Sequence, residues 1–505
     1  MKRLSKKQMI IFSLGQFGWS LLGGIISAWL VTYFLPTSGD AAAGATKYIV
    51  PGLVIGGFMT VLGLITALSR IFDAVTDPLI ASLSDRSKNP RGRRIPFMQV
   101  AAIPFAVITV LMFCIDFGAF NSSLGWLNIL WVSVMIVLFY LFMTMYCTPY
   151  NALISEFGHN QEDRMFISTA ISFTYLFGTL FAYLPFVISG ASVDPETGVY
   201  TPKLITGLLL NGGMDAAKAY AWSFRIAFII LAAIALVAML LPTFLLKERD
   251  FVDSKPDKTN AFKSLTATFK NKDFRVFVGS DIMYWIGLTL FQTGLPFFIK
   301  VMTKDTDGAS VLYYMGAMTL LSAVFYPFVT KFVKKFGKKK LVIFAFFGLA
   351  LAYTSAALIG RFWTLSIDPF TIVTVIVAAF PMALLGIIPQ SMVADVAEAE
   401  AKVTGENREG MFFAARTFAM KLGQSVAMLA FTSLALIGST SKTDTDIVPS
   451  KIGMLIVAIV AIVFCVLGAV VLFFYNEKKV MKTIAKKGDE AFLEAAEKDR
   501  VPGEK

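Results

Sequence analysis

Long runs of apolar residues, separated by short polar segments, dominate the chain and predict about twelve membrane-spanning helices. Each run holds about 20 residues, which is the length that an α-helix needs to cross the hydrocarbon core of a bilayer. The runs lack the strict alternation of polar and apolar positions that barrel strands show, so they exclude a membrane β-barrel. They begin near residues 9, 50, 97, 124, 165, 220, 274, 311, 341, 370, 411 and 452.

The composition agrees with a protein that crosses a membrane many times. Hydrophobic residues make up 56% of the chain and charged residues only 16%. The net charge of +12 comes from Lys and Arg that gather in alternate loops, which is the positive-inside pattern. This pattern predicts that both termini lie in the cytoplasm, with the chain in the cell membrane, and it removes the need for a nucleic-acid partner. The basic segments are Lys2–Lys7, Arg86–Arg94, Lys247–Lys272, Lys331–Lys340 and Lys478–Lys487.

The longest predicted cytoplasmic segment divides the chain into two similar parts. The basic loop Asp85–Arg94 follows the second span, and Lys334–Lys340 follows the eighth, as two related bundles of six helices would show. The predicted fold is therefore an all-α membrane protein of two pseudo-symmetric six-helix bundles. The expected divisions are an N-terminal bundle (1–246), a middle loop (247–273), a C-terminal bundle (274–476) and a cytoplasmic tail (477–505).

Asp73 and Asp77 are ionisable residues in the second predicted span. An acid at membrane depth costs roughly 2.5–3.5 kcal/mol on insertion scales, which predicts that the two have a use. Their i, i+4 spacing places both carboxylates on one helix face together with Arg70. The cluster fits a site for a small cation or a proton, and it fits equally well a charge network that holds helices together.

The tenth and eleventh spans carry a second set of charges. Arg416 and Lys421 lie in an apolar helix and need anionic partners, and the acids of the second span are the natural candidates for Lys421. Charges near the cytoplasmic ends are expected to form gate ion pairs that break in one state of the protein; solvated loop charge is the alternative. These predicted gate residues are Asp85, Arg93, Asp395, Glu398 and Arg408.

Enzymatic chemistry has little support in the sequence. The three cysteines lie far apart, and one histidine is present, so neither a zinc site nor a Ser/His/Asp triad is expected. We expect no enzyme and no cofactor.

The combination of motifs resembles the glycoside–pentoside–hexuronide:cation symporters, a branch of the major facilitator superfamily that includes the melibiose carrier. The run Arg70–Pro78 carries the resemblance first, followed by an Arg-Gly-Arg-Arg loop and Pro96. It extends over nearly the whole membrane region. The other matching segments are Thr148–Leu153 with Glu156, Met392–Val396, Thr404–Gly405, Arg408–Gly410 and Lys421–Gln424.

The resemblance implies coupled transport of a small-molecule solute, expected to be a saccharide, with Na⁺, Li⁺ or H⁺ by alternating access. It implies that the cation binds to Asp73 and Asp77 with Thr76 and Thr144, and that Lys421 and Arg70 couple the cation site to the solute site. The implied solute-binding residues are Gln16, Trp19, Ser20, Cys147, Tyr150, Asn151, Arg416 and Thr417.

The chain departs from the melibiose carrier where that carrier holds its sugar. Two acids of the carrier correspond to Ser20 and Cys147, which removes strong acceptors for sugar hydroxyls. Arg416 adds a positive charge, and we therefore hypothesise that the solute carries or tolerates a negative charge. Two other interpretations stay open, a carrier of the same fold for a lysolipid and a sensor that no longer transports.

Overall fold

The computed structural model describes the membrane region and most of the loops. The described residues are 3–52, 55, 59–85, 87, 89–115, 117–157, 161–194, 197–251, 266, 268–303, 310–360, 369–404, 409–439 and 448–485.

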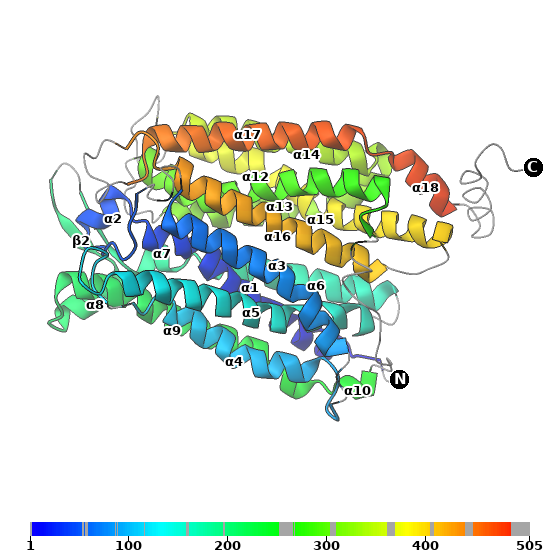
Figure 1. Cartoon of the computed structure of the whole chain (residues 1–505), viewed down its shortest axis with the longest axis horizontal. Coiled ribbons are helices and arrows are strands. Elements are labelled where there is room, and N and C mark those ends of the chain that lie inside the picture. Colours follow the sequence, from blue (N-terminus) through cyan, green and yellow to red (C-terminus); the bar gives the residue numbers. More distant parts are fainter. Residues whose placement is uncertain are drawn as a thin grey trace, which may run out of the picture.

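Twelve long helices run side by side along the long axis of the described part of the molecule (Figure 1). They correspond in order to the predicted spans, which confirms the all-α membrane fold. Their bounds are α1 Lys6–Phe34, α3 Val61–Asp85, α4 Ile95–Leu111, α5 Trp126–Phe157, α6 Gln161–Phe181, α9 Ala216–Leu245, α12 Lys272–Met302, α13 Ser310–Phe336, α14 Lys338–Ala357, α15 Pro369–Thr404, α16 Glu409–Leu434 and α17 Lys451–Phe473.

The remaining elements are short and lie at the ends of the long helices. In the strand pair, β1 is antiparallel to β2, with Ala191 opposite Pro202. The short elements are α2 Ser38–Ala42, α7 Pro185–Ile188, β1 Ala191–Val193, β2 Tyr200–Pro202, α8 Leu204–Asn211, α10 Glu248–Phe251 and α18 Glu477–Ala485.

Among the described residues, nine helices are long and apolar enough to cross a membrane on length and composition alone. The other three of the twelve are α3, α4 and α16. Helix α4 has only 17 residues, and α3 and α16 carry the charged side chains described below. Of these three helices, α3 and α16 therefore depart from the apolar pattern because they hold the ionisable residues of the site.

The second span begins later than its apolar run predicts. The run begins near residue 50, but α3 begins at Val61, after an isolated bridge between Ile55 and Met59. Proline and glycine at 51, 52, 56 and 57 explain the difference, because both residue types disfavour a helix. The later start places Asp73 near the middle of α3 instead of toward its end.

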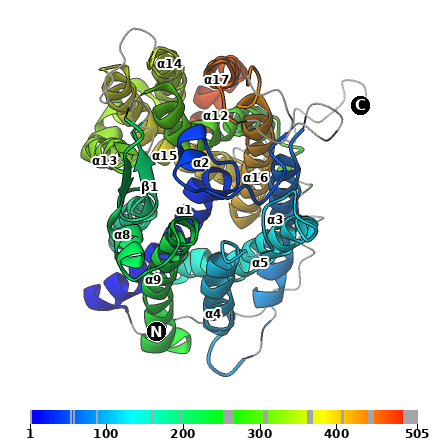
Figure 2. The ribbon, with the colours of Figure 1, turned by 90° about the vertical axis from the view of Figure 1, so that its left-hand side faces the viewer.

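The start of α1 and helix α18, the first and last elements that the structure describes, lie at the same end of the molecule (Figure 1). We call this end, which carries α10 and α18, the terminus face. The opposite end, which carries α2, α8 and the β1–β2 pair, is the hairpin face, and Figure 2 looks onto it. Which face meets the cytoplasm stays a prediction from the distribution of Lys and Arg.

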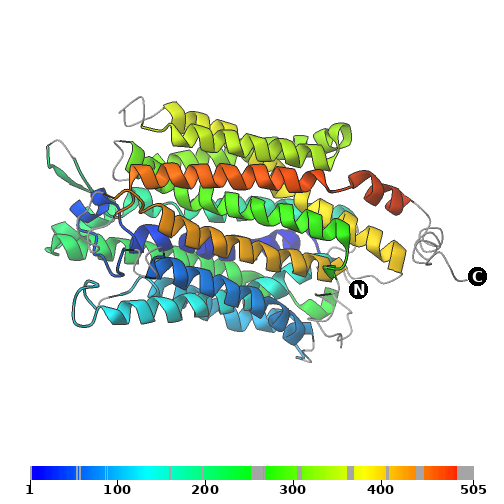
Figure 3. The same cartoon turned by 45° about the horizontal axis from the view of Figure 1, so that its top comes forward.

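The helices before residue 247 pack mainly on one another, as do those after residue 271. In the first half, α1 packs against α6 and α9, and α4 packs against α5 and α9. In the second half, α12 packs against α16 and α17, and α14 against α15 and α17. The halves meet chiefly where α3 lies along α16 (Figure 3), with smaller contacts of α1 with α12 and of α6 with α13. The exact boundaries of the two predicted bundles stay a prediction.

Glycines bring α1 close to both of its neighbours in the first half. A Cβ atom on Gly18 would lie 2.5 Å from the carbonyl oxygen of Ala235 in α9. A Cβ atom on Gly178 of α6 would lie 2.1 Å from the Ser20 hydroxyl oxygen. Small residues at such positions let the backbones of membrane helices come close together. The resulting van der Waals contacts stabilise the packing, because the hydrophobic effect does not drive helices together within lipid.

A glutamate caps the start of α4 from a distant part of the chain. Glu248 is the first residue of α10, and its Oε1 accepts a hydrogen bond of 2.8 Å from the backbone N–H of Arg93. Its Oε2 accepts from the N–H groups of Arg94 and Ile95 at 2.8 and 2.9 Å. A carboxylate at a helix N-terminus satisfies unpaired N–H groups and interacts favourably with the helix dipole.

The second half repeats this cap. Glu477, the first residue of α18, accepts hydrogen bonds of 2.7 and 3.0 Å from the N–H groups of Lys338 and Lys339 at the start of α14. In each half a glycine with positive φ precedes the capped helix, Gly92 at φ 135° and Gly337 at φ 81°. In the second half Gly337 alone separates α13 from α14, so the basic residues Lys334–Lys340 lie mostly in the two helix ends and not in a loop. The similarity between the two basic segments, seen first in the sequence, extends to the acid that caps the helix after each of them.

Candidate cation and solute site

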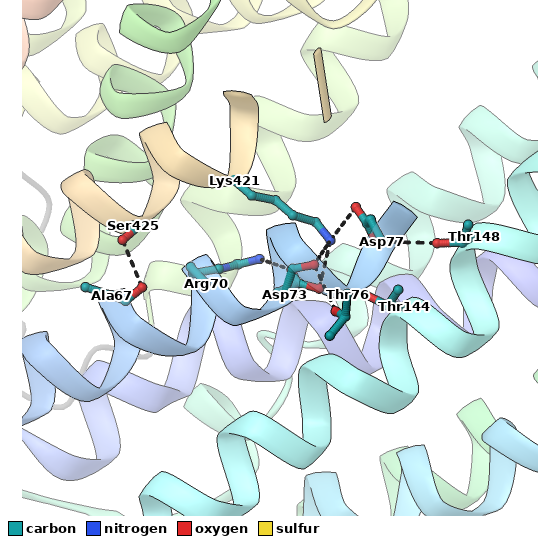
Figure 4. Close-up of polar contacts among 9 residues, drawn as sticks. All are labelled: Ala67, Arg70, Asp73, Thr76, Asp77, Thr144, Thr148, Lys421 and Ser425. Carbon is teal, nitrogen blue, oxygen red and sulfur yellow. Dashed lines mark hydrogen bonds and ion pairs between the residues drawn. The ribbon is translucent and has the colours of Figure 1, made fainter. Parts of the chain in front are cut away.

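The predicted acid pair lies at the contact between the two halves. Asp73 and Asp77 are one turn apart on α3, on the side that meets α16 and α5 (Figure 4). The Asp73 side chain is 0% exposed and that of Asp77 is 20% exposed. Both carboxylates therefore lie where an unpaired charge is costly.

Lys421 of α16 contacts both acids at once. Its Nζ lies 2.7 Å from Oδ1 of Asp73 and 2.7 Å from Oδ2 of Asp77 (Figure 4). This confirms the prediction that the acids of the second span are the partners of this lysine. Because the acids belong to the first half and Lys421 to the second, the same contact that neutralises the charges also joins the halves.

Threonines of α5 complete the oxygen-rich side of the cluster. The Thr144 hydroxyl donates to Oδ1 of Asp73 at 2.7 Å, and the Thr148 hydroxyl reaches Oδ1 of Asp77 at 3.4 Å. Thr76 instead donates to the backbone oxygen of Asp73 at 3.0 Å, so its hydroxyl hydrogen does not serve the carboxylates. Sequence analysis did not assign Thr148 to the site, although its i+4 spacing from Thr144 places it on the same helix face.

Arg70 lies beside the acid pair at a longer distance. Its Nη1 is 3.8 Å from Oδ2 of Asp73, and its guanidinium carbon lies 4.5 Å from the centre of the Tyr140 ring. Two basic side chains, Arg70 and Lys421, thus face two acids. The cluster is electrically balanced without any bound ion.

A second buried ion pair lies within the second half. The Nε and Nη2 atoms of Arg416 donate to the two carboxylate oxygens of Asp281 on α12, at 2.8 and 3.1 Å. Sequence analysis did not identify Asp281, although an acid within an apolar span is the signal that singled out Asp73. We expected Arg416 to add an unmatched positive charge to the solute site. In the structure Asp281 neutralises that charge, so it is not free to attract an acidic solute.

Two of the expected solute residues are used inside the first half. Ser20 is buried against Gly178, and its hydroxyl donates to the backbone oxygen of Phe17 at 3.1 Å. Tyr150 is fully buried, and its hydroxyl donates to the backbone oxygen of Phe12 at 3.0 Å. In this conformation both hydroxyl hydrogens serve helix packing, so the structure does not offer them to a solute.

The other expected solute residues differ in exposure. Trp19 is half-buried beside Tyr175, and its indole N–H has no acceptor among the described residues. The Thr417 hydroxyl donates to the backbone oxygen of Phe413 at 3.0 Å. Of the remaining three, Gln16 is buried, Cys147 is half-buried and Asn151 is exposed.

The gate role of the residues named for the terminus face stays a prediction. Asp395 pairs with Lys338, which belongs to the same half. Glu398 is exposed, and the backbone N–H of Arg93 donates to Glu248 of α10, in the segment that follows the first half. Arg408 and the side chain of Asp85 lie outside the described residues.

A buried ion pair between the halves lies at the hairpin face. Lys300 near the end of α12 bonds to Oδ1 of Asp40 in α2, and both residues are buried. The Thr37 hydroxyl donates to Oδ2 of Asp40 at 2.7 Å, and the Tyr220 hydroxyl reaches its Oδ1 at 3.4 Å. The sequence does not reveal this pair, because Asp40 lies between the predicted spans, where an acid is common and indicates no particular role.

The profile of the family described as "MFS/sugar transport protein" matches residues 11–478. The chain belongs to this family. Its fold and family are those of transporters and not of enzymes, and the resemblance to cation symporters is confirmed. The chain is thus a multi-pass membrane transporter.

Several curated proteins are similar over most of their length. An uncharacterised symporter, YjmB of Bacillus subtilis, is 27% identical, over 86% of this chain and 84% of that protein. The isoprimeverose transporter of Lactiplantibacillus pentosus is 24% identical, over 82% and 77%. Sodium-dependent lysophosphatidylcholine symporter 1 of Xenopus tropicalis is 23% identical, over 87% of each chain.

Solved structures show the same fold at low sequence identity. A D-xylose–proton symporter aligns with a TM-score of 0.61 and 14% identity, covering 94% of this chain and 98% of that one. The inward-open xylose transporter XylE of E. coli gives 0.60 and 13%, with the same coverage.

Proposed function

We propose that the protein is a secondary active symporter, which couples uptake of a sugar or glycoside to a cation by alternating access. The observation that carries the proposal is the position of Lys421 between Asp73 and Asp77. An ammonium group there interacts with the carboxylate oxygens that a small coupling cation would need. The lysine is in effect a cation tethered to the second half.

The geometry supports a simple coupling scheme. A cation that binds to Asp73, Asp77 and the Thr144 hydroxyl competes with the Lys421 ammonium for the same oxygens. Once displaced, the lysine no longer ties α16 to α3, and it needs another partner, because a buried unpaired charge is costly. If oxygen atoms of the solute, such as its hydroxyls, accept hydrogen bonds from the displaced ammonium group, only the state loaded with both ligands lets the halves move relative to each other.

The coupling ion belongs to a small group. Two carboxylates and neighbouring hydroxyls are hard oxygen ligands, which suit Na⁺ or Li⁺, and the same carboxylates accept a proton. We expect no other cofactor. The expected setting is the cell membrane, with the terminus face toward the cytoplasm, as the alternation of Lys and Arg predicts.

A saccharide is the preferred solute class, because the family is described by sugar transport and one relative is named for isoprimeverose. A lysolipid is the second candidate, because another relative is named for lysophosphatidylcholine. Exposed aromatic side chains on α6 and α13, among them Phe173, Phe177 and Phe328, would suit a lipid chain as well as the surrounding bilayer. A sensor without transport is least favoured, since it has no need of the lysine and two acids in its membrane region.

The deciding experiment measures solute uptake by the full-length protein in proteoliposomes. A panel of neutral glycosides, uronides and lysolipids is offered under an inward Na⁺ gradient, an inward proton gradient or neither. The proposal expects saccharide accumulation driven by one of the gradients and its loss in Asp77→Cys. Accumulation of a lysolipid alone would transfer the proposal to the second candidate, and uptake that ignores both gradients would refute symport.

A further inference from the structure

The Arg416–Asp281 pair has no role in the coupling scheme above, yet it lies next to it. Arg416 precedes Lys421 by five residues on α16, and Asp281 lies on α12, which packs against α16. The pair is bidentate and buried, with Arg416 7% and Asp281 4% exposed. A fixed fork of this kind holds the guanidinium group in one orientation.

The pair also completes a balance of charge in the middle of the membrane region. On α3, α12 and α16, the three basic residues there are Arg70, Arg416 and Lys421, and the three acids are Asp73, Asp77 and Asp281. Each basic group faces an acid. On α12 and α16 the charges of Arg416 and Asp281 cancel, so Lys421 is the remaining charge that these two helices bring to this region.

Neutral hydrogen-bonding groups without partners lie within one turn of these ions. The indole N–H of Trp285, four residues after Asp281, is buried and has no acceptor among the described residues. The carboxamide oxygen of Gln424, three residues after Lys421, is buried and has no donor in the same part of the chain. Buried polar groups normally find partners, so an unpaired donor and an unpaired acceptor point to a ligand that supplies both. A hydroxyl both donates and accepts, and neutral sugars and uronides both carry hydroxyls, so these two groups favour a saccharide and leave its charge to the ion pair.

We propose that Asp281 is a positioning residue that sets the charge preference of the solute site. By pairing with Arg416 it presents a neutral surface to the solute, and the carrier selects an uncharged, hydroxyl-bearing solute over its anionic counterpart. This reverses the expectation of an acidic solute that Arg416 gave on its own. The inference rests on the proposed sugar symport.

The test compares two glycosides that differ only at C6, a nitrophenyl hexoside and the corresponding nitrophenyl hexuronide. Uptake of each is measured in proteoliposomes for the wild type and for Asp281→Asn, Arg416→Gln and the double variant. The wild type is expected to prefer the hexoside. Asp281→Asn frees the charge of Arg416, and the ratio of kcat/KM should move toward the hexuronide by about tenfold. The double variant restores neutrality and should return the ratio to that of the wild type.

Arg416→Gln provides a test in the opposite direction. It leaves the Asp281 carboxylate without its partner, so uptake of the hexuronide should fall further, by a similar factor. Asp250→Asn is the matched control, since Asp250 is exposed at the terminus face and should change nothing. Size-exclusion chromatography shows which variants fold, and the double variant has no unpaired charge that would prevent folding.

The outcomes separate the inference from the function on which it rests. A wild type that accumulates hexuronide in preference to hexoside overturns the inference and leaves symport intact. So does a ratio that stays unchanged in both single variants. A wild type that accumulates neither glycoside under either gradient refutes the proposed function, and the inference falls with it.

Discussion

Lys421 and Asp77 belong to different halves of the chain, and their side chains meet with 2.7 Å between Nζ and Oδ2. Asp73 lies at the same distance from the same nitrogen. A hydrogen bond of 2.9 Å from the Ser425 hydroxyl to the Ala67 backbone oxygen joins the same two helices one turn further along (Figure 4). The contact that the coupling cation is proposed to disturb is therefore part of the main contact between the halves.

Replacement of Asp77 by Cys should abolish cation-driven accumulation and leave membrane insertion intact. The variant removes one of two carboxylates that contact Lys421, so neither the cation nor the lysine keeps its full set of ligands. Solute uptake is measured in vesicles with and without the driving gradient. Asp250→Asn serves as the control with an acid removed from an exposed position. Full concentrative uptake by Asp77→Cys would refute the coupling role.

Replacement of Lys421 by Met should raise the apparent affinity for the coupling cation by about tenfold, because the tethered competitor is removed. Loss of one partner from a buried ion pair costs about 3–5 kcal/mol, so the variant should be less stable than the wild type when no cation is present. Added cation should then raise its melting temperature more than that of the wild type. A thermal-shift titration measures both effects. A lower cation affinity would show that the lysine supports the cation site instead of competing for it.

The sequence was sufficient for the fold and for the partners of Lys421. Apolar runs of membrane length have few structural alternatives, and a lysine in such a run requires an acid. Asp281 carries the same signal, because it is an acid within the apolar run of the seventh span. The hydrogen-bond partners of Ser20 and Tyr150 could not be predicted from the sequence. The rotation of a helix about its axis decides whether a hydroxyl meets a solute or a neighbouring backbone, and sequence spacing does not determine that rotation.

The ion pair between the halves shows a second limit of sequence reasoning. Asp40 and Lys300 lie 260 positions apart, and each follows or ends a long helix, where charged residues are common. Only burial distinguishes this ion pair from ordinary charges at helix ends. Burial there depends on how the two halves pack, which the sequence does not show. The predicted gate pairs at the terminus face stay a prediction, and this pair at the hairpin face was not among them.

Asp40→Asn should weaken closure at the hairpin face. The change leaves Lys300 buried without its acid, which favours a conformation in which the lysine reaches water. Spin labels at Ser38→Cys and Thr303→Cys, in a background without native cysteines, would report the distance across this face by pulsed EPR. We expect the long-distance population to increase. Asp215→Asn, an exposed acid at the same face, is the control, and an unchanged distance distribution in Asp40→Asn would show that the pair does not hold the face closed.

The two capping glutamates should contribute to stability independently and by similar amounts. Glu248→Gln and Glu477→Gln each keep the shape of the side chain but remove the charge that the helix N-terminus favours. Loss of a cap costs about 0.5–2 kcal/mol, so each variant should lower the apparent melting temperature by a few degrees, and the double variant by about the sum of the two. Differential scanning fluorimetry of the purified protein measures this, with the exposed Glu398→Gln as the control. A double variant no less stable than either single one would show that the two caps are not independent.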